Sequence, residues 1–104
     1  MSDHRFGEVW TVQLGDRQED RLIVSGDFYH TLYGDNVLTA HVAPADMARS
    51  LTAFVVDVGD GQAAMVDRIS TVAVTRLKSK VGNLPEAQLS DVRSMIGTIF
   101  GLTG

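Results

Sequence analysis

The feature that most constrains the fold is a helical pattern of apolar residues close to the end of the chain. From Glu86 onward, apolar side chains recur three and four positions apart, at Leu89, Val92, Ile96 and Ile99. This spacing places them on one face of an α-helix, which must be buried against another element. Pro85 suits the first helical position, where its missing N–H group costs nothing. The sequence therefore predicts a closing amphipathic helix packed on a core built by the preceding residues.

The preceding residues read as short β-strands separated by turns. Runs rich in β-branched and apolar residues predict strands over 6–14, 21–25, 36–42, 51–58, 62–67 and 69–74. Residues 15–20 are interpreted as a polar turn and 59–61 as a tight hairpin turn. Residues 28–33 and 45–49 fit either a loop or a helical turn, and 75–78 fit a single helical turn. The tally predicts a mainly β (α+β) fold: a small, partly open antiparallel β-barrel closed by a C-terminal α-helix.

Size and composition restrict the class of protein. A chain of 104 residues fits a single domain over 1–104. No apolar run approaches the roughly 18 residues that a membrane span needs, and the first residues do not resemble a signal peptide. The sequence has no cysteine, so thiolate metal sites and disulfides are excluded. We expect a cytoplasmic protein with no membrane association.

The net charge of −4 argues against a protein that coats nucleic acid non-specifically. Binding phosphates requires clustered lysine and arginine side chains. A local basic groove remains compatible with this charge.

The order of these segments resembles the MazF/PemK toxin family over nearly the whole chain. The resemblance is carried by Gly7-Glu8-Val9-Trp10, by Leu22-Ile23-Val24-Ser25, and by the closing segments 67–72 and 81–84. It implies an SH3-like barrel that forms a homodimer, with an RNA groove across the dimer face. It also implies the toxin component of a type II toxin-antitoxin system, held by an antitoxin protein. The implied activity is endonuclease cleavage of single-stranded mRNA, with no metal or other cofactor.

The chain departs from the family pattern at two positions that matter for catalysis. Active members usually carry Arg-Pro before the second strand, where this chain has Glu19-Asp20. They also carry Thr or Ser after the third strand, where this chain has Ala43-Pro44. The strand period of two offers a replacement for the first, because Arg21 would share a face with position 19.

Metal-independent RNA cleavage requires a base, an acid and positive charge for the phosphorane. The candidate catalytic residues are Arg21, Asp67 and His41, and Asp67 matches an aspartate that some family members use. Each has a plainer reading: an ion pair of Arg21 with Glu19 or Asp20, a turn cap for Asp67, and a structural strand histidine for His41. The RNA-binding candidates are Arg17, Arg49 and Arg68.

A second function stays open on the same residues. A catalytically degenerate protein of this fold would bind a protein partner, an antitoxin or gyrase, without cutting RNA. The related CcdB gyrase poisons act through an aromatic residue near the C-terminus, and here the nearest is Phe100. Trp10 suits base stacking less well than a core or dimer-interface position.

Overall fold

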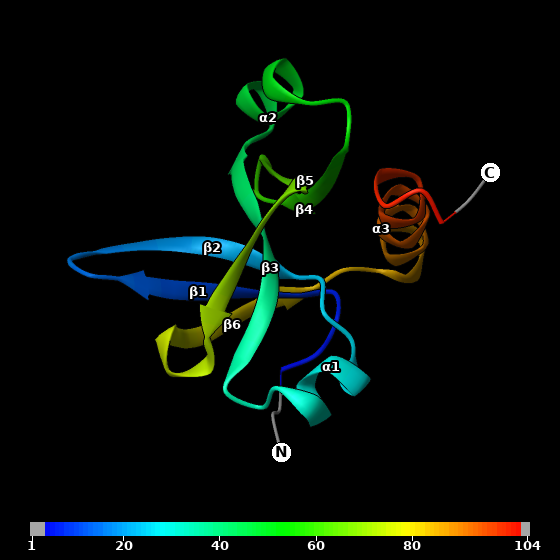
Figure 1. Ribbon diagram of the computed structural model, residues 1–104. Helices are drawn as coiled ribbons and strands as arrows, with labels where there is room; N and C mark the ends of the chain where they lie inside the picture. The colour runs from blue at the N-terminus through cyan, green and yellow to red at the C-terminus, as the bar shows by residue number, and fades with distance from the viewer. Residues whose placement is uncertain (1–3, 103–104) are drawn as a thin grey trace.

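The computed structural model describes residues 4–102 and forms one six-stranded antiparallel sheet (Figure 1). The elements are β1 (Glu8–Leu14), β2 (Arg17–Ile23), α1 (Asp27–Leu32), β3 (Asn36–Pro44), α2 (Ala45–Leu51), β4 (Val55–Gly59), β5 (Gln62–Ala73), the 3-10 turn η1 (Val74–Arg76), β6 (Leu77–Asn83) and α3 (Glu86–Ile99). The strand order is β4-β5-β3-β2-β1-β6, so β4 and β6 form the two edges. The predicted mainly β fold, a partly open antiparallel barrel with a closing helix, is confirmed as a curled sheet with α3 packed on it.

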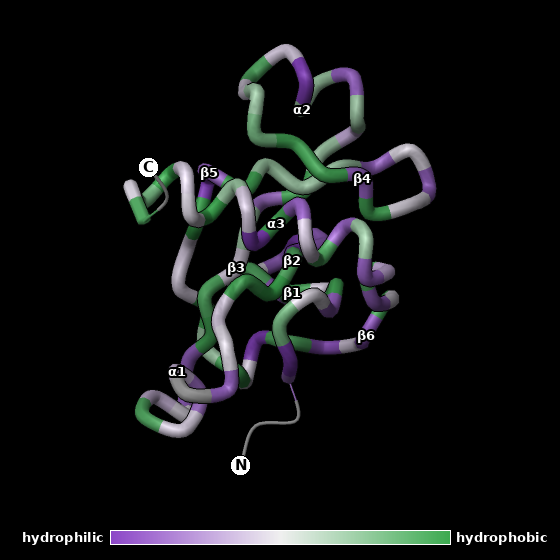
Figure 2. The backbone as a smooth tube through the Cα atoms, turned by 90° about the vertical axis from the view of Figure 1, so that its right-hand side faces the viewer, coloured by the Kyte–Doolittle hydropathy of each residue, from purple (hydrophilic) through white to green (hydrophobic). Residues whose placement is uncertain are grey.

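The closing helix covers one face of the sheet. It lies beside the sheet in Figure 1 and in front of it in Figure 2. Its apolar residues pack with strand residues in a shared core that includes Val9, Leu22, Ala40, Val66 and Val92. The helical pattern of the sequence therefore marks the surface that holds helix and sheet together.

Gly7 fixes the close approach of α3 to the start of β1. Its φ of +89° is a conformation that residues with a Cβ rarely adopt. A Cβ atom at this position would also lie 2.2 Å from Cδ2 of Leu89. The backbone conformation therefore favours glycine, and a larger residue would also require the Leu89 side chain to move.

The sheet face turned away from α3, called the far face below, holds two further apolar clusters. One lies toward η1 and contains Val12, Ile23, Val37, Val72 and Leu77. The other packs α2 on the sheet through Ala48, Ala63 and Met65. Figure 1 shows α2 at one end of β3 and α1 at the other.

Several boundaries differ from those predicted. Residues 17–20 belong to β2 rather than to a turn, because they pair with residues 11–14 of β1 despite their polar sequence. Leu51 ends α2 and residues 52–54 connect it to β4, which starts only at Val55. The segment 77–83, for which the sequence predicts no strand, forms the edge strand β6 despite its polar sequence. The ambiguous segments 28–33 and 45–49 lie largely in the short helices α1 and α2.

No helix within residues 4–102 is long and apolar enough to cross a membrane.

Candidate functional site on the far face

Polar side chains of three neighbouring strands meet on the far face, between the two apolar clusters. Alternation along β2 puts Glu19 and Arg21 on the same face as buried Ile23. Alternation along β3 likewise puts Thr39 and His41 on the face of Val37. The antiparallel register pairs Arg21 with His41 and Thr39 with Ser70 of β5, so the three strands bring these residues together. We call Glu19, Arg21, Thr39, His41 and Ser70 the far-face cluster.

Arg21 is the buried cation of this cluster, with only 5% of the residue exposed. Its Nε donates to Oε1 of Glu19 at 2.9 Å, and its Nη2 contacts the same oxygen. Its Nη1 donates to Oγ1 of Thr39 at 3.3 Å, and that hydroxyl donates to the carbonyl oxygen of Ser70 at 3.1 Å. The ion pair anticipated for Arg21 is therefore present with Glu19, and the guanidinium is buried rather than on the surface.

His41 lies opposite Arg21 and is fixed by β5. Its Nε2 lies 2.8 Å from Oγ of Ser70, within hydrogen-bond distance. A cavity of about 290 Å³ beside the ring is lined by His41, Met65, Arg68 and Ile69. Burial lowers the pKa of His41, and the positive charges of Arg21 and, to a smaller extent, Arg68 lower it further, while Glu19 opposes them. The imidazole is thus neutral more readily than a free histidine.

The carboxylate of Glu19 is held in its ionised form. The hydrogen bonds from Arg21 are the largest cause of the lowered pKa of Glu19, and burial opposes them. The charges of Arg21, Arg17 and His41 lower the pKa of Glu19 in addition. The two titratable groups of the cluster therefore differ in environment: Glu19 is kept charged and His41 is pushed toward neutrality.

An irregularity in β5 lies directly beside His41. The register with β3 passes from Ala40 opposite Ile69 to His41 opposite Met65, which leaves residues 66–68 of β5 outside the ladder. Bulges of this kind redirect side chains and are common next to active sites. Here the bulge brings Arg68 to the cavity of His41.

Asp67 lies on the same bulge and is exposed, but its side chain contacts a residue outside the far-face cluster. Its Oδ2 accepts a hydrogen bond from Oγ1 of Thr52 at 2.9 Å, at the end of α2. Arg49 of α2 is also exposed and pairs with Asp57 of β4 at 2.8 Å. The contacts of Asp67 and Arg49 therefore lie with α2 and β4, whereas those of Arg21 and His41 lie within the far-face cluster.

Arg17 is exposed at the start of β2, two residues before Glu19 and close enough to lower its pKa. Of the six residues proposed from the sequence, the structure brings Arg17, Arg21, His41 and Arg68 to one place. Sequence reasoning missed Thr39 and Ser70, and it identified Glu19 only as an ion-pair partner on the same face as Arg21. Strand alternation would also have placed Thr39 on the face of His41.

Trp10 belongs to the packing of the far face rather than to the cluster. The half-buried ring packs against the apolar residues next to η1. Its Nε1 donates to Oε1 of Glu8 at 2.9 Å, and Nζ of Lys80 lies 3.1 Å from Oε2 of the same carboxylate. Burial alone would raise the pKa of Glu8, but these bonds and that from the Arg5 amide outweigh it and lower the pKa. This arrangement fastens β1 to the edge strand β6.

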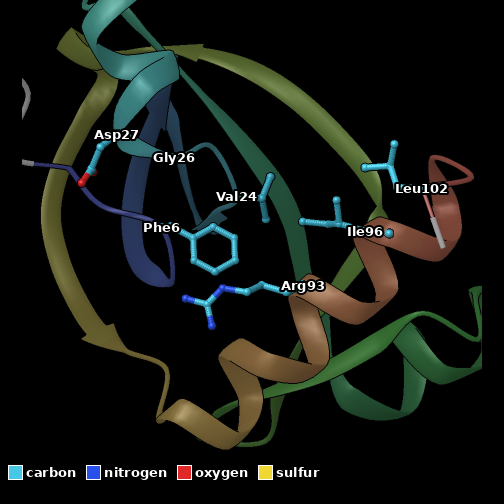
Figure 3. Close-up of a pocket in the computed structure, with 8 residues that line it drawn as sticks. Phe6, Val24, Gly26, Asp27, Arg93, Ile96 and Leu102 are labelled. Atoms are coloured by element: carbon cyan, nitrogen blue, oxygen red, sulfur yellow. The ribbon is translucent and has the colours of Figure 1, made fainter.

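A larger cavity lies on the opposite face, between α3 and the connection from β2 to α1. Its volume is about 590 Å³, and its lining includes Phe6, Val24, Asp27, Arg93 and Ile96. Figure 3 shows the Phe6 ring among Val24, Ile96 and Arg93, and the guanidinium carbon of Arg93 lies 5.2 Å from the ring centroid. Mostly apolar groups surround this space, so it offers little for proton transfer.

Within residues 4–102, the His, Asp and Glu side chains form no group of three that could hold a metal ion.

Comparisons with known proteins agree with this architecture. The chain is similar to a mycobacterial endoribonuclease solved in complex with its cognate antitoxin, at 19% identity and a TM-score of 0.79, covering 100% of this chain and 99% of that one. It is similar to a MazE-MazF complex from Deinococcus radiodurans at 14% identity and a TM-score of 0.79, covering 99% and 100%. It is also similar to the toxin MazF-mt6 of Mycobacterium tuberculosis at 18% identity and a TM-score of 0.69, covering 93% and 99%.

No curated protein sequence is similar enough to this chain to count as a match. Residues 5–100, in contrast, match a family described as PemK-like, MazF-like toxins of type II toxin-antitoxin systems. The resemblance inferred from the order of the segments is thereby confirmed over nearly the whole sequence. This chain belongs to the PemK-like, MazF-like toxin family of type II toxin-antitoxin systems.

Proposed function

We propose that this protein cleaves single-stranded RNA without a metal ion, and that the reaction takes place at the far-face cluster. The observation that carries the proposal is the cavity shared by His41 and Arg68, directly beside the ion pair of Arg21 and Glu19. The cluster combines a titratable imidazole, a carboxylate and guanidinium groups, which together cover proton transfer and charge stabilisation. Membership of the toxin family and similarity to proteins named endoribonucleases support the same activity.

Arginine side chains suited to binding RNA lie on either side of the far-face cluster. Arg17 and Arg68 are exposed, one at the start of β2 and the other on the bulge of β5, and β3 is the strand between β2 and β5 in the sheet. Their guanidinium groups suit contacts with successive phosphates of a single strand. Arg49 stays a predicted RNA contact, and from its place on α2 it would touch a more distant nucleotide.

We also propose that the protein acts as a homodimer and that an antitoxin protein controls it. Exposed apolar side chains on β6 and after α3, namely Val81, Phe100 and Leu102, are suited to burial in a protein interface. The two similar structures solved with an antitoxin support such a partner. A monomer in light scattering at micromolar concentration would contradict the dimer.

The test is incubation of the purified protein with a long single-stranded RNA in EDTA, followed by mapping of the product ends. We expect discrete cuts that leave 2′,3′-cyclic phosphate or 3′-phosphate ends. Intact RNA after incubation with folded protein would contradict the proposal and favour a protein that acts only by binding a partner. The predicted catalytic role of Asp67 is tested in the same assay, since Asp67→Asn should then lose activity while keeping its stability.

A further inference from the structure

The far-face cluster contains a buried cation, and three of its five N–H donors are already engaged. The side chain of Arg21 is 6% exposed, and three of its N–H groups are directed at Glu19 and Thr39. A phosphate that approached from solvent would meet Glu19 before it met this guanidinium. The geometry therefore suits Arg21 to holding another side chain rather than to binding the substrate.

The side chain that Arg21 holds is the more accessible of the pair. The carboxylate-bearing side chain of Glu19 is 32% exposed. Both contacts from Arg21 go to its Oε1, so the ion pair does not require Oε2. A carboxylate anchored by one oxygen and partly open to solvent can accept a proton on the other.

Glu19 also lies at a useful distance from His41. Because Arg21 is directly opposite His41 in the ladder, Glu19, two residues away on the same face, is the diagonal neighbour of His41. Diagonal neighbours in antiparallel pairs have Cα atoms about 7–8 Å apart. A ribose and its phosphate fit between side chains with that separation, and Arg17 and Arg68 flank the same space.

We propose that Glu19 is the general base of this site, that His41 is its general acid, and that Arg21 is a positioning residue for the Glu19 carboxylate. This inference rests on the proposed RNA cleavage and assigns a role to a residue that replaces the arginine expected from the family pattern. Ionisation is compatible with these roles: the lowered pKa of Glu19 keeps its carboxylate able to accept a proton, and His41, whose pKa is also lowered, donates a proton from its imidazolium form, which acidic pH favours.

The reaction then balances without a further reagent. The Glu19 carboxylate takes the proton of the ribose 2′-hydroxyl, and the 2′-oxygen forms a bond to phosphorus. The bond from phosphorus to the 5′-oxygen of the next nucleotide breaks, and the His41 imidazolium gives that oxygen its proton. The products are a 2′,3′-cyclic phosphate and a 5′-hydroxyl. Proton exchange with water restores both side chains.

The test compares Glu19→Gln with Asp20→Asn in single-turnover cleavage of RNA. Gln keeps an oxygen that can accept the hydrogen bonds of Arg21 but cannot serve as a base. Asp20 is a matched control, because it is the next residue, its substitution makes the same change in charge, and its Oδ1 instead accepts a hydrogen bond from Thr11 at 3.1 Å. We expect Glu19→Gln to cut at least about 100-fold more slowly while binding RNA at least as tightly, since general bases contribute about 10²–10⁴-fold. Asp20→Asn should cut at nearly the normal rate.

The pH profile separates a base from a merely structural carboxylate. Glu19 is faced by Arg21 and Arg17 from β2 and by His41 from β3. His41 is faced by Arg21 and Glu19 from β2 and by Arg68 from β5. In the unmodified protein the rate should fall at acidic pH as Glu19 becomes protonated, and this fall should be absent in Glu19→Gln. Glu19→Asp, which keeps a shorter carboxylate, should regain part of the rate and the acidic fall, and this keeps the test valid if the Gln variant folds poorly.

The possible outcomes are distinguishable. If the unmodified protein cuts RNA and both Glu19→Gln and Glu19→Asp cut within threefold of its rate, Glu19 is not the base and the proposed nuclease function stands. A Glu19→Gln variant that cuts faster would likewise overturn the assignment and make Glu19 a barrier to substrate. If the unmodified protein leaves RNA intact, both the nuclease function and the role of Glu19 are wrong.

Discussion

The two faces of the sheet differ in whether they bury a charged side chain. On the far face, the guanidinium of Arg21 is nearly fully buried and lies between a carboxylate, a hydroxyl and an imidazole. On the α3 face, the ion pairs join exposed side chains, Arg5 with Asp27 at 3.6 Å and Arg93 with Glu86 at 3.3 Å. Exposed pairs contribute about 0–1 kcal/mol to stability, whereas a buried charge has a desolvation cost that its partners must offset.

The buried charge and the larger cavity lie on opposite faces of the sheet. The α3-face cavity, at about 590 Å³, is twice as large as the far-face cavity of about 290 Å³. The larger space is lined mostly by apolar groups, while the smaller one is lined by His41, whose pKa is lowered and whose neighbour Glu19 also has a lowered pKa. A displaced pKa in a cleft is a better guide to a catalytic site than the volume of the cleft. This comparison supports the proposal that RNA is cleaved on the far face.

The largest effect should come from removing the imidazole. His41→Asn keeps a polar side chain that can bond to Ser70 but cannot transfer a proton. We expect kcat/KM for RNA to fall at least about 100-fold, as for the loss of a general acid. The measurement is cleavage of a labelled RNA, with circular dichroism to confirm folding. A folded variant that cuts normally would remove His41 from the mechanism.

The pH dependence of the unmodified protein should be nearly as large. The active form needs Glu19 ionised and His41 protonated, and the pKa of His41 lies below its usual 6.5. The rate should therefore fall as pH rises through that pKa, by about tenfold for each further pH unit. The profile of kcat/KM from pH 4 to 9 measures this, after subtraction of uncatalysed hydrolysis. If kcat/KM instead increased up to pH 8, His41 would be the general base.

Arg21→Met should have a smaller effect on rate and a diagnostic effect on pH. The guanidinium lowers the pKa of both Glu19 and His41, so its removal should move both limbs of the pH profile upward. We expect about a tenfold loss of rate at the optimum, corresponding to about 1.4 kcal/mol, because the carboxylate is no longer held. A loss of rate without movement of the limbs would mean that Arg21 acts only through stability.

The smallest effect should follow removal of one phosphate contact. Arg68→Ala should raise KM severalfold with little change in kcat, and lower the dependence of binding on salt by about one counterion. Arg93→Ala on the α3 face is the matched control, since it removes the same charge from an exposed position. Equal effects of the two substitutions would mean that RNA does not distinguish the faces.

Much of the fold follows from local patterns. The apolar spacing from Leu89 to Ile99 predicts α3, and Gly59-Asp60-Gly61 predicts the turn between β4 and β5. Edge strand β6 was missed because Lys78 and Lys80 give it a polar sequence, although edge strands commonly carry lysine. Its pairing with β1 depends on a partner about 70 residues earlier in the chain, which no local pattern reveals.

The candidate site could be predicted only in part from the sequence, because it too depends on how separate strands pair. Arg21 and His41 were identified by residue type, but their pairing depends on the register of β2 with β3. In the sequence, Glu19 stands where the family pattern has an arginine and is interpreted only as a possible ion-pair partner of Arg21. The base role that we propose for Glu19 depends on the strand, which places it beside Arg21 and diagonally to His41.

The most direct test of the account is an NMR titration with a single-stranded DNA oligonucleotide. This probe has the phosphates of the substrate but lacks the 2′-hydroxyl, so it cannot be cut by the proposed reaction. We predict that amide shifts concentrate in β2 around Arg17 to Arg21, at His41 and at Arg68. Shifts confined to Phe6, Asp27 and α3 would place the nucleic acid on the opposite face and contradict the central claim.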